Sequence, residues 1–270
     1  MERIINNVKI HYQEYGAGKT IYFLHGLGLD IASMMQTYDR FLADKNIRRV
    51  YIDLPGMGES GVNENLKNSD DILHTIQQFI VADSGDEAVS LFGHSYGGYL
   101  CFGLAHKLKG KVNSLFITCP VLIANINNRK TAKHKNIFQE KVSVESNESY
   151  YEDFLSMNVL INNKAWENYQ KAIIPGLTKF NSDFWDNLQS NYFKNYSFSF
   201  EEELVSSSTK YKGITLLGKN DQVVGYHDQL SLLDGSNDLE VAVLNDAGHN
   251  LFIDVQEDMD FYLNRFLQLL

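Results

Sequence analysis

Residues 93–98 read Gly-His-Ser-Tyr-Gly-Gly and follow the apolar run Ala88-Val89-Ser90-Leu91-Phe92. The run predicts a short buried strand, and the residues from 97 onward predict a helix, so Ser95 is expected on a sharp strand-to-helix turn. Such a turn strains the backbone, and a side chain at 93 or 97 would collide with the neighbouring strand or with the start of the helix. The pattern therefore predicts a serine hydroxyl exposed at the edge of a sheet.

Four further motifs stand where an apolar run ends. They are His25-Gly26-Leu27-Gly28 after the run from Thr20, Asp53-Leu54-Pro55-Gly56-Met57-Gly58-Glu59-Ser60 after Val50-Tyr51-Ile52, Gly218-Lys219-Asn220-Asp221 after Ile214-Thr215-Leu216-Leu217, and Asp246-Ala247-Gly248-His249 after Val241-Ala242-Val243-Leu244. Open α/β sheets bind ligands beyond the carboxyl ends of their strands, so these motifs are expected to gather at one edge.

Strands and helices are expected to alternate, which is the rhythm of a parallel sheet. Residues 8–15 predict a first hairpin strand, with Gly16-Ala17-Gly18 as the turn and Thr20–Leu24 as the next strand. The last helix is expected to pack one apolar face on the sheet. Further strands are predicted near 48–53, 88–92, 112–118, 213–217 and 239–244, and helices near 33–44, 70–83, 97–109 and 251–268.

The five motifs resemble those of the α/β-hydrolase superfamily, with serine, acid and histidine in that family's chain order. The resemblance runs from about residue 8 to the end of the chain, apart from a middle section. It implies an α/β fold with a mostly parallel central sheet flanked by helices and a helical cap inserted after the sixth core strand. We expect residues 1–120 and 211–270 to form the core and residues 121–210 to form the cap.

The middle section is polar and helical in pattern, and its residues 138–200 hold 14 of the 33 Phe, Tyr and Trp residues of the chain. By resemblance it lies over Ser95, and its aromatic content predicts an apolar acyl or aromatic substrate pocket. Trp166, Tyr169 and Trp185 are the candidate lining residues. The alternative is that these bulky side chains pack the lid onto the core.

A serine hydroxyl needs a base that takes its proton as it attacks a carbonyl, and His249 is the candidate. A third group must orient the imidazole. Asp221 matches the family's acid position, whereas Asp246 is the alternative and is expected to fix a turn.

The resemblance further implies an oxyanion hole made by the backbone N–H groups of Leu27 and Tyr96. His25, Asp53 and Ser60 are expected to shape turns. His94 is expected to pack.

The formal net charge of -10 and the pI of about 5.2 disfavour nucleic acid and anionic membrane surfaces as partners. Residues 1–7 lack the apolar core of a secretory signal, and no stretch is apolar enough to span a membrane. Cys101 and Cys119 are expected to be small buried hydrophobes in a reducing compartment, with a disulfide as the alternative. A cytoplasmic protein is expected.

Cofactor and metal sites are not expected. Gly18-Lys19-Thr20 resembles the end of a phosphate-binding loop, but Gln13 stands where that loop needs glycine. The chain has no His-x-x-x-His or Cys-x-x-Cys spacing.

These features predict a serine hydrolase, and foremost a carboxylesterase for a small ester with an apolar acyl or aromatic group. The same residues serve thioesters, lactones, C–C bonds beside a carbonyl, or acyl transfer. Serine at 95 disfavours the haloalkane and epoxide reactions of relatives with aspartate there, and the absence of proline in residues 25–28 disfavours peptides. A non-catalytic receptor for a small ligand is the alternative from another class. The oligomeric state is left open.

Overall fold

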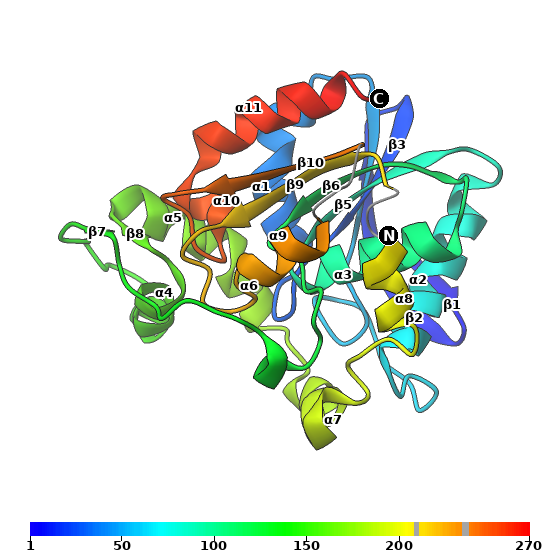
Figure 1. Ribbon diagram of the computed structural model, residues 1–270, viewed down its shortest axis with the longest axis horizontal. Helices are drawn as coiled ribbons and strands as arrows, with labels where there is room; N and C mark the ends of the chain where they lie inside the picture. Colours follow the sequence, from blue (N-terminus) through cyan, green and yellow to red (C-terminus); the bar gives the residue numbers. More distant parts are fainter. Residues whose placement is uncertain (208–210, 234–237) are drawn as a thin grey trace.

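The computed structural model describes residues 1–207, 211–233 and 238–270. Within these residues eight strands form one sheet, and every neighbouring pair from β4 onward is parallel. The mostly parallel α/β sheet predicted from the sequence is therefore confirmed (Figure 1). Across the sheet the order is β1 (Glu2–Ile5), β2 (Val8–Tyr15), β4 (Ile47–Ile52), β3 (Lys19–Leu24), β5 (Val89–His94), β6 (Val112–Thr118), β9 (Gly213–Gly218) and β10 (Leu239–Leu244).

The predicted pairing of β2 with β3 is wrong, because β4 lies between them and pairs antiparallel with β2. The hairpin partner of β2 is β1, across a turn at Asn6 and Asn7 with positive φ at both residues. Gly16 does not close a hairpin but allows a close contact between backbone segments. A Cβ there would overlap the carbonyl oxygen of Ile47, so the glycine lets the chain pass close to the start of β4.

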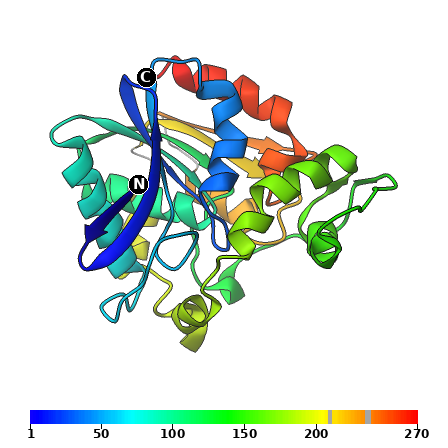
Figure 2. The same cartoon turned by 180° about the vertical axis from the view of Figure 1, so that it is seen from behind.

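Helices cover both faces of the sheet (Figures 1 and 2). On one face lie α1 (Ile31–Leu42) and α11 (Gln256–Leu267), and on the other lie α2 (Ser69–Ser84), α3 (Tyr96–Lys107) and α9 (His227–Leu233). Short polar side chains begin two of these helices: Asp30 accepts from the N–H of Ala32, and Asn68 accepts from that of Asp71.

The last helix packs as predicted but is not continuous. Its buried side chains include Phe266, whose ring lies 5.0 Å from the ring of Phe92 on β5. The helix is interrupted at Val255, which separates α10 (Leu251–Asp254) from α11. The break separates α10, whose Asp254 is hydrogen-bonded to Gly248 in the loop before it, from the helix that covers the sheet.

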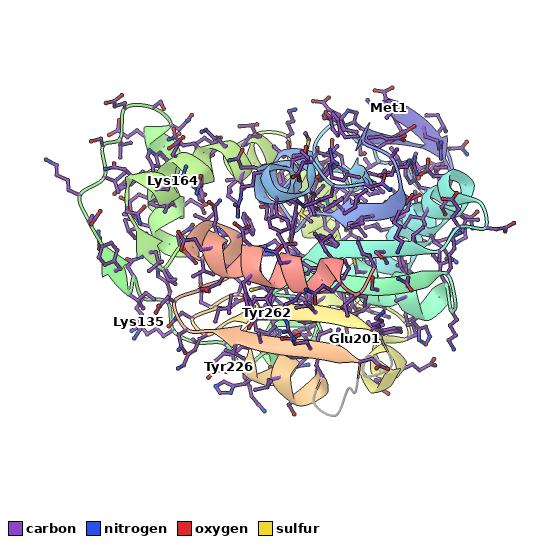
Figure 3. The ribbon with its side chains drawn as sticks, turned by 90° about the horizontal axis from the view of Figure 1, so that it is seen from above. Met1, Lys135, Lys164, Glu201, Tyr226 and Tyr262 are labelled. Atoms are coloured by element: carbon purple, nitrogen blue, oxygen red, sulfur yellow. The ribbon has the colours of Figure 1, made fainter. Side chains whose placement is uncertain are left out.

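The chain between β6 and β9 forms an insert that lies largely beyond the carboxyl ends of the strands, whereas its last helix, residues 201–207, packs against α3 and α9 (Figure 1). Figure 3 places Lys135 and Lys164 of this insert at the end of the molecule away from Met1. The predicted end of the insert at residue 210 lies outside the described residues. Its elements are η1 (Ile126–Asn128), β7 (Phe138–Gln139), η2 (Glu148–Tyr150), α4 (Tyr151–Met157), β8 (Leu160–Ile161), α5 (Asn163–Ala172), α6 (Ile174–Leu177), α7 (Ser182–Phe193) and α8 (Glu201–Ser207).

Two sequence expectations on single features have a structural answer. Cys101 and Cys119 are both buried and carry free thiols, so the alternative of a disulfide is wrong. Among the described helices, none combines the length and the apolar character that crossing a membrane requires.

The close contact at Gly97 predicts a large effect on stability. A Cβ at this position would overlap the carbonyl oxygen of Leu24 and lie 2.5 Å from that of His25, so Gly97→Ala should lower the free energy of unfolding by at least about 3 kcal/mol. Gly61→Ala is the matched control, because a Cβ there meets nothing nearer than 3.7 Å. Thermal and urea unfolding measure both, and equal stability of the two variants would contradict the packing described.

Candidate active site

Ser95 lies on the turn between β5 and α3 with a positive φ of 53°. Few L residues adopt this conformation, and the surrounding glycines make room for it. A Cβ at Gly93 would lie 2.6 Å from the carbonyl oxygen of Gly97, and a Cβ at Gly97 would overlap that of Leu24. The two predicted steric reasons for glycine at 93 and 97 are thus confirmed.

Three loop side chains meet at the carboxyl edge of the sheet. The Nε2 atom of His249 lies 3.0 Å from the Oγ of Ser95, and its Nδ1 lies 2.8 Å from an Oδ of Asp221. The loops follow β5, β9 and β10, and residues 95 and 249 are 154 positions apart. Asp246 stays exposed on its turn, so the residue that the structure brings to His249 is Asp221.

The carboxylate of Asp221 is fully buried and still ionised at neutral pH. Burial by itself raises the pKa of Asp221, but the charge and hydrogen bond of His249 and two backbone N–H groups outweigh burial, and the net pKa is lowered. The N–H groups belong to Val223 and Val224, at 2.8 and 2.9 Å. An ionised acceptor keeps a proton on Nδ1 of His249 and leaves Nε2 to accept from Ser95.

Leu27 and Tyr96, the two residues expected to form an oxyanion hole, both lie close to Ser95. Leu27 lines the cavity beside Ser95, and Tyr96 is the first residue of α3. The hydrogen bonds found in the described part of the chain leave the backbone N–H of both residues without a protein acceptor. Two such donors beside a serine can stabilise negative charge on a substrate oxygen.

A buried histidine holds the loop that carries Leu27. His25 donates from Nδ1 to the carbonyl oxygen of Gly26 at 2.8 Å and accepts at Nε2 from the N–H of Leu54 at 3.0 Å. Burial lowers the pKa of His25, with the charge of Asp53 opposing it. A neutral ring can make both bonds at once, which is the loop-shaping role expected from the sequence.

Asp53 and Ser60 fix the neighbouring turn, as expected. The carboxylate of Asp53 accepts from the N–H groups of Ile31 and Glu59, both at 2.9 Å, and Ser60 donates to the carbonyl oxygen of Asp53 at 2.7 Å. His11 contacts the same carboxylate at 2.7 Å.

His94 is packed, and it also lines the cavity. Its Nδ1 lies 3.0 Å from the Oγ1 of Thr118, and its ring centre lies 5.0 Å from that of His249. Burial, followed by the nearby His249, lowers the pKa of His94 well below its ordinary value. His94 is therefore neutral at physiological pH, and the hydrogen bond found for its ring goes to Thr118 and not to Ser95.

A cavity of about 120 Å³ opens beside Ser95 and His249. Its walls combine residues of the core loops with aliphatic and polar residues of the insert. They are Gly26, Leu27, Leu29, His94, Ser95, Asp153, Met157, Ile173, Leu177, His249 and Asn250.

The predicted lining by Trp166, Tyr169 and Trp185 is corrected here, since none of the three borders this cavity. The ring of Trp166 stacks on that of Tyr169, and Trp185 packs edge-on against Tyr96. Large aromatic side chains bury the most apolar area, and here that area holds the insert together and attaches it to α3. The aromatic content of the sequence indicated a packed insert but not its cavity wall.

Two residues missed from the sequence join the insert to the loops of the site. The carboxylate of Asp254 accepts from the N–H of Gly248 at 2.9 Å and from those of Val159 and Leu160 at 3.4 and 3.3 Å. Burial raises the pKa of Asp254 to about 6, against the effect of these bonds. Gln222, next to Asp221, donates to the carbonyl oxygen of Ser156 at 3.0 Å. The sequence did contain a signal for Asp254, because this acid stands inside the apolar run Leu251–Val255.

One group of metal-ligand atoms was found among the described residues, and it overlaps the relay. Atoms of Cys119, Asp221 and His249 lie within 4.8 Å of one another. The Nδ1 of His249 and the carboxylate of Asp221 are already 2.8 Å apart, which is a hydrogen-bond distance with no space for an ion between them. The arrangement of these atoms fits a proton relay better than a metal centre.

Comparisons with known proteins agree on one family. A sequence profile described as alpha/beta hydrolase fold matches residues 19–255. The crystal structure of an alpha/beta superfamily hydrolase from Oenococcus oeni PSU-1 is 41% identical, has a TM-score of 0.91 and covers 99% of this chain and 98% of that chain.

Two curated relatives match over part of the chain. The pimeloyl-(acyl-carrier protein) methyl ester esterase of Vibrio parahaemolyticus is 29% identical over 109 residues, which are 40% of each protein. The dihydrolipoyllysine-residue acetyltransferase component of the acetoin cleaving system of Cupriavidus necator is 30% identical over 118 residues, 43% of this chain and 31% of that protein. This chain thus spans less than half the length of either.

The geometry of His25 predicts its tautomer. Because Nε2 accepts from Leu54 and burial lowers the pKa of His25 below its ordinary value, we expect a neutral ring with the proton on Nδ1 at neutral pH. Two-bond proton–nitrogen NMR spectra report the tautomer through the nitrogen shifts. In urea the pKa of the same residue should be about 6.5. A proton on Nε2, or a normal titration in the folded protein, would contradict the loop structure described.

Proposed function

Since the chain belongs to the α/β-hydrolase fold family, we propose that it is a serine hydrolase that cleaves a small carboxylic ester through an acyl-enzyme on Ser95. The observation that carries the proposal is the relay in which one imidazole, His249, lies 3.0 Å from Ser95 and 2.8 Å from Asp221. In this reading the insert acts as a cap over the cavity.

In the proposed acylation step, Ser95, His249 and Asp221 each have a separate role. The Oγ of Ser95 attacks the ester carbonyl carbon while its proton passes to Nε2 of His249, and the Asp221 carboxylate stabilises the imidazolium. The carbonyl oxygen becomes an oxyanion, which the N–H groups of Leu27 and Tyr96 bind. The tetrahedral intermediate then collapses, and the leaving alcohol takes the proton from His249.

Deacylation repeats the steps with water. His249 takes a proton from a water molecule as its oxygen attacks the acyl carbon, and the second tetrahedral intermediate passes through the same two backbone donors. When it collapses, Ser95 regains its proton from His249 and the carboxylic acid leaves. The protein returns to its starting state without a cofactor.

The cavity supports a short, mainly aliphatic acyl group. Its volume of about 120 Å³ is smaller than the ~150 Å³ of an engineered cavity that binds benzene. Leu27, Leu29 and Ile173 supply aliphatic surface on its walls. Of the apolar acyl and aromatic groups expected from the sequence, we therefore propose the aliphatic class.

One of the two curated relatives supports ester cleavage. The Vibrio parahaemolyticus protein is by its name a methyl ester esterase, although it aligns with only 40% of this chain. A fluorophosphonate probe distinguishes the proposed hydrolase from the alternative, a non-catalytic receptor. The probe labels a serine only where a base and an oxyanion hole activate it.

Ser95→Ala should abolish fluorophosphonate labelling and lower kcat/KM for a short p-nitrophenyl ester by at least about a thousandfold, because the acyl-enzyme cannot form. Ser199→Ala, at an exposed serine, is the matched control and should leave both unchanged. Mass spectrometry locates the label. A wild-type protein that stays unlabelled, or a Ser95→Ala variant of full activity, would reject the proposal.

Asp221→Asn should lower kcat by about a hundred- to ten-thousandfold with a smaller change in KM, because the amide no longer fixes the productive tautomer of His249. Asp246→Asn should stay within about twofold of wild type, since that carboxylate is exposed on a turn. Steady-state kinetics on the same ester compare the two. The reverse order of effects would show that the acid assignment is wrong.

A further inference from the structure

The cap side of the cavity contains one carboxylate. Among the described residues that line the cavity, Asp153 is the one acidic side chain, and it comes from α4 of the insert. The other lining residues that the insert supplies are apolar: Met157, Ile173 and Leu177. A charged group beside apolar side chains is costly to cover unless the covering molecule hydrogen-bonds to it.

A buried tyrosine holds this carboxylate in place. The hydroxyl of Tyr169 donates to the Oδ2 of Asp153, and the Tyr169 side chain is completely buried. Burial, and then the bond to Asp153, raise the pKa of Tyr169, so the hydroxyl stays protonated as a donor. Tyr169 does not border the cavity, but it orients a residue that does.

The second carboxylate oxygen remains available. The hydrogen bonds found in the described parts of the chain use Oδ2 and the backbone carbonyl of Asp153, and none uses Oδ1. An ionised carboxylate oxygen accepts from hydroxyl and ammonium groups and repels another carboxylate. The formal net charge of -10 adds to that repulsion.

Position on the helix does not account for Asp153. Acidic residues are common in the first turn of a helix because they face its positive end. Glu152 occupies the same turn and would supply that effect, yet Glu152 does not line the cavity. Among the described residues, the tyrosine hydroxyl that bonds to this turn, that of Tyr169, goes to Asp153. Glu152 and Asp153 therefore differ in access to the cavity, where a ligand would bind.

We propose that Asp153 is a specificity-determining residue that selects substrates carrying an uncharged or cationic hydrogen-bond donor, a hydroxyl or an ammonium group, on the part that fills the cavity. It disfavours substrates whose acyl chain ends in a carboxylate. This inference rests on the proposed hydrolase function and narrows its substrate class.

Four ethyl esters test the proposal, because they share a leaving group and nearly the same acyl length. They are the esters of butanoic, 3-hydroxybutanoic and 3-aminobutanoic acid, and the monoester of succinic acid. Acid release at constant pH gives kcat/KM for each. For the wild type we expect the hydroxyl and ammonium esters to exceed the butanoate by about five- to tenfold and the succinate to fall about tenfold below it, as hydrogen bonds to a charged group at a partly exposed site allow.

The variants separate hydrogen bonding from charge. Asp153→Ala should bring all four esters to within about twofold of one another. Asp153→Asn keeps an acceptor oxygen but no charge, so it should retain the preference for hydroxyl while losing the preference for ammonium and the rejection of succinate. Glu152→Gln is the matched control and should preserve the wild-type ratios.

The readouts keep the two claims apart. Cleavage of ethyl butanoate and fluorophosphonate labelling of Ser95 report the hydrolase function and an intact site in every variant. If both are present and Asp153→Ala keeps the wild-type ratios, the specificity inference is overturned while the hydrolase stands. If the wild type neither cleaves any ester nor is labelled, the proposed function is overturned and this inference with it.

Discussion

The site depends on how closely the first turn of α3 approaches the end of β3. At Gly97 the two backbones leave no room for a Cβ, and at Gly26 a Cβ would lie 3.2 Å from the Cβ of Ser95. β3 continues directly into His25 and Gly26, so this approach places the serine and the loop bearing Leu27 against each other. Proteins are packed too densely for one of these parts to shift alone. Ser95 and the backbone N–H groups of Leu27 and Tyr96 therefore form one rigid unit, and the fold supplies their relative position before any substrate binds.

Asp221 and His249 are held differently, because both belong to loops that contact the insert. Asp254 ties Gly248, next to His249, to Val159 and Leu160, while Gln222, next to Asp221, is bonded to Ser156. Residues 156–160 of the insert thus touch both loops through hydrogen bonds. The insert both encloses the cavity and supports the side of the relay that the sheet does not fix.

The sequence revealed those parts of the site whose geometry is local. The glycines around Ser95 mark a position that a few neighbouring residues determine. Asp221 and His249 were indicated by the resemblance of their motifs to those of the family, and the structure brings the three side chains together. Strand pairing depends on residues far apart in the sequence. Gly16 indicates an irregular backbone, but the sequence around it does not identify β4 as the strand that lies next to it. The cavity wall was also out of reach, since the aromatic content of the insert cannot tell a residue that packs, such as Trp185, from one that faces a ligand.

Burial acts selectively on the ionisable groups around the relay. His94, with its ring centre 5.0 Å from that of His249, is kept neutral mainly by desolvation, and so is the thiol of Cys119. A second imidazolium at that distance would oppose the positive charge that the proposed mechanism places on His249. Asp221 is as deeply buried but has His249 and two backbone N–H groups as partners, which more than offset the cost of its charge. The same low-polarity surroundings therefore remove competing charges and strengthen the Asp221–His249 interaction that the proposed acyl transfer at Ser95 requires.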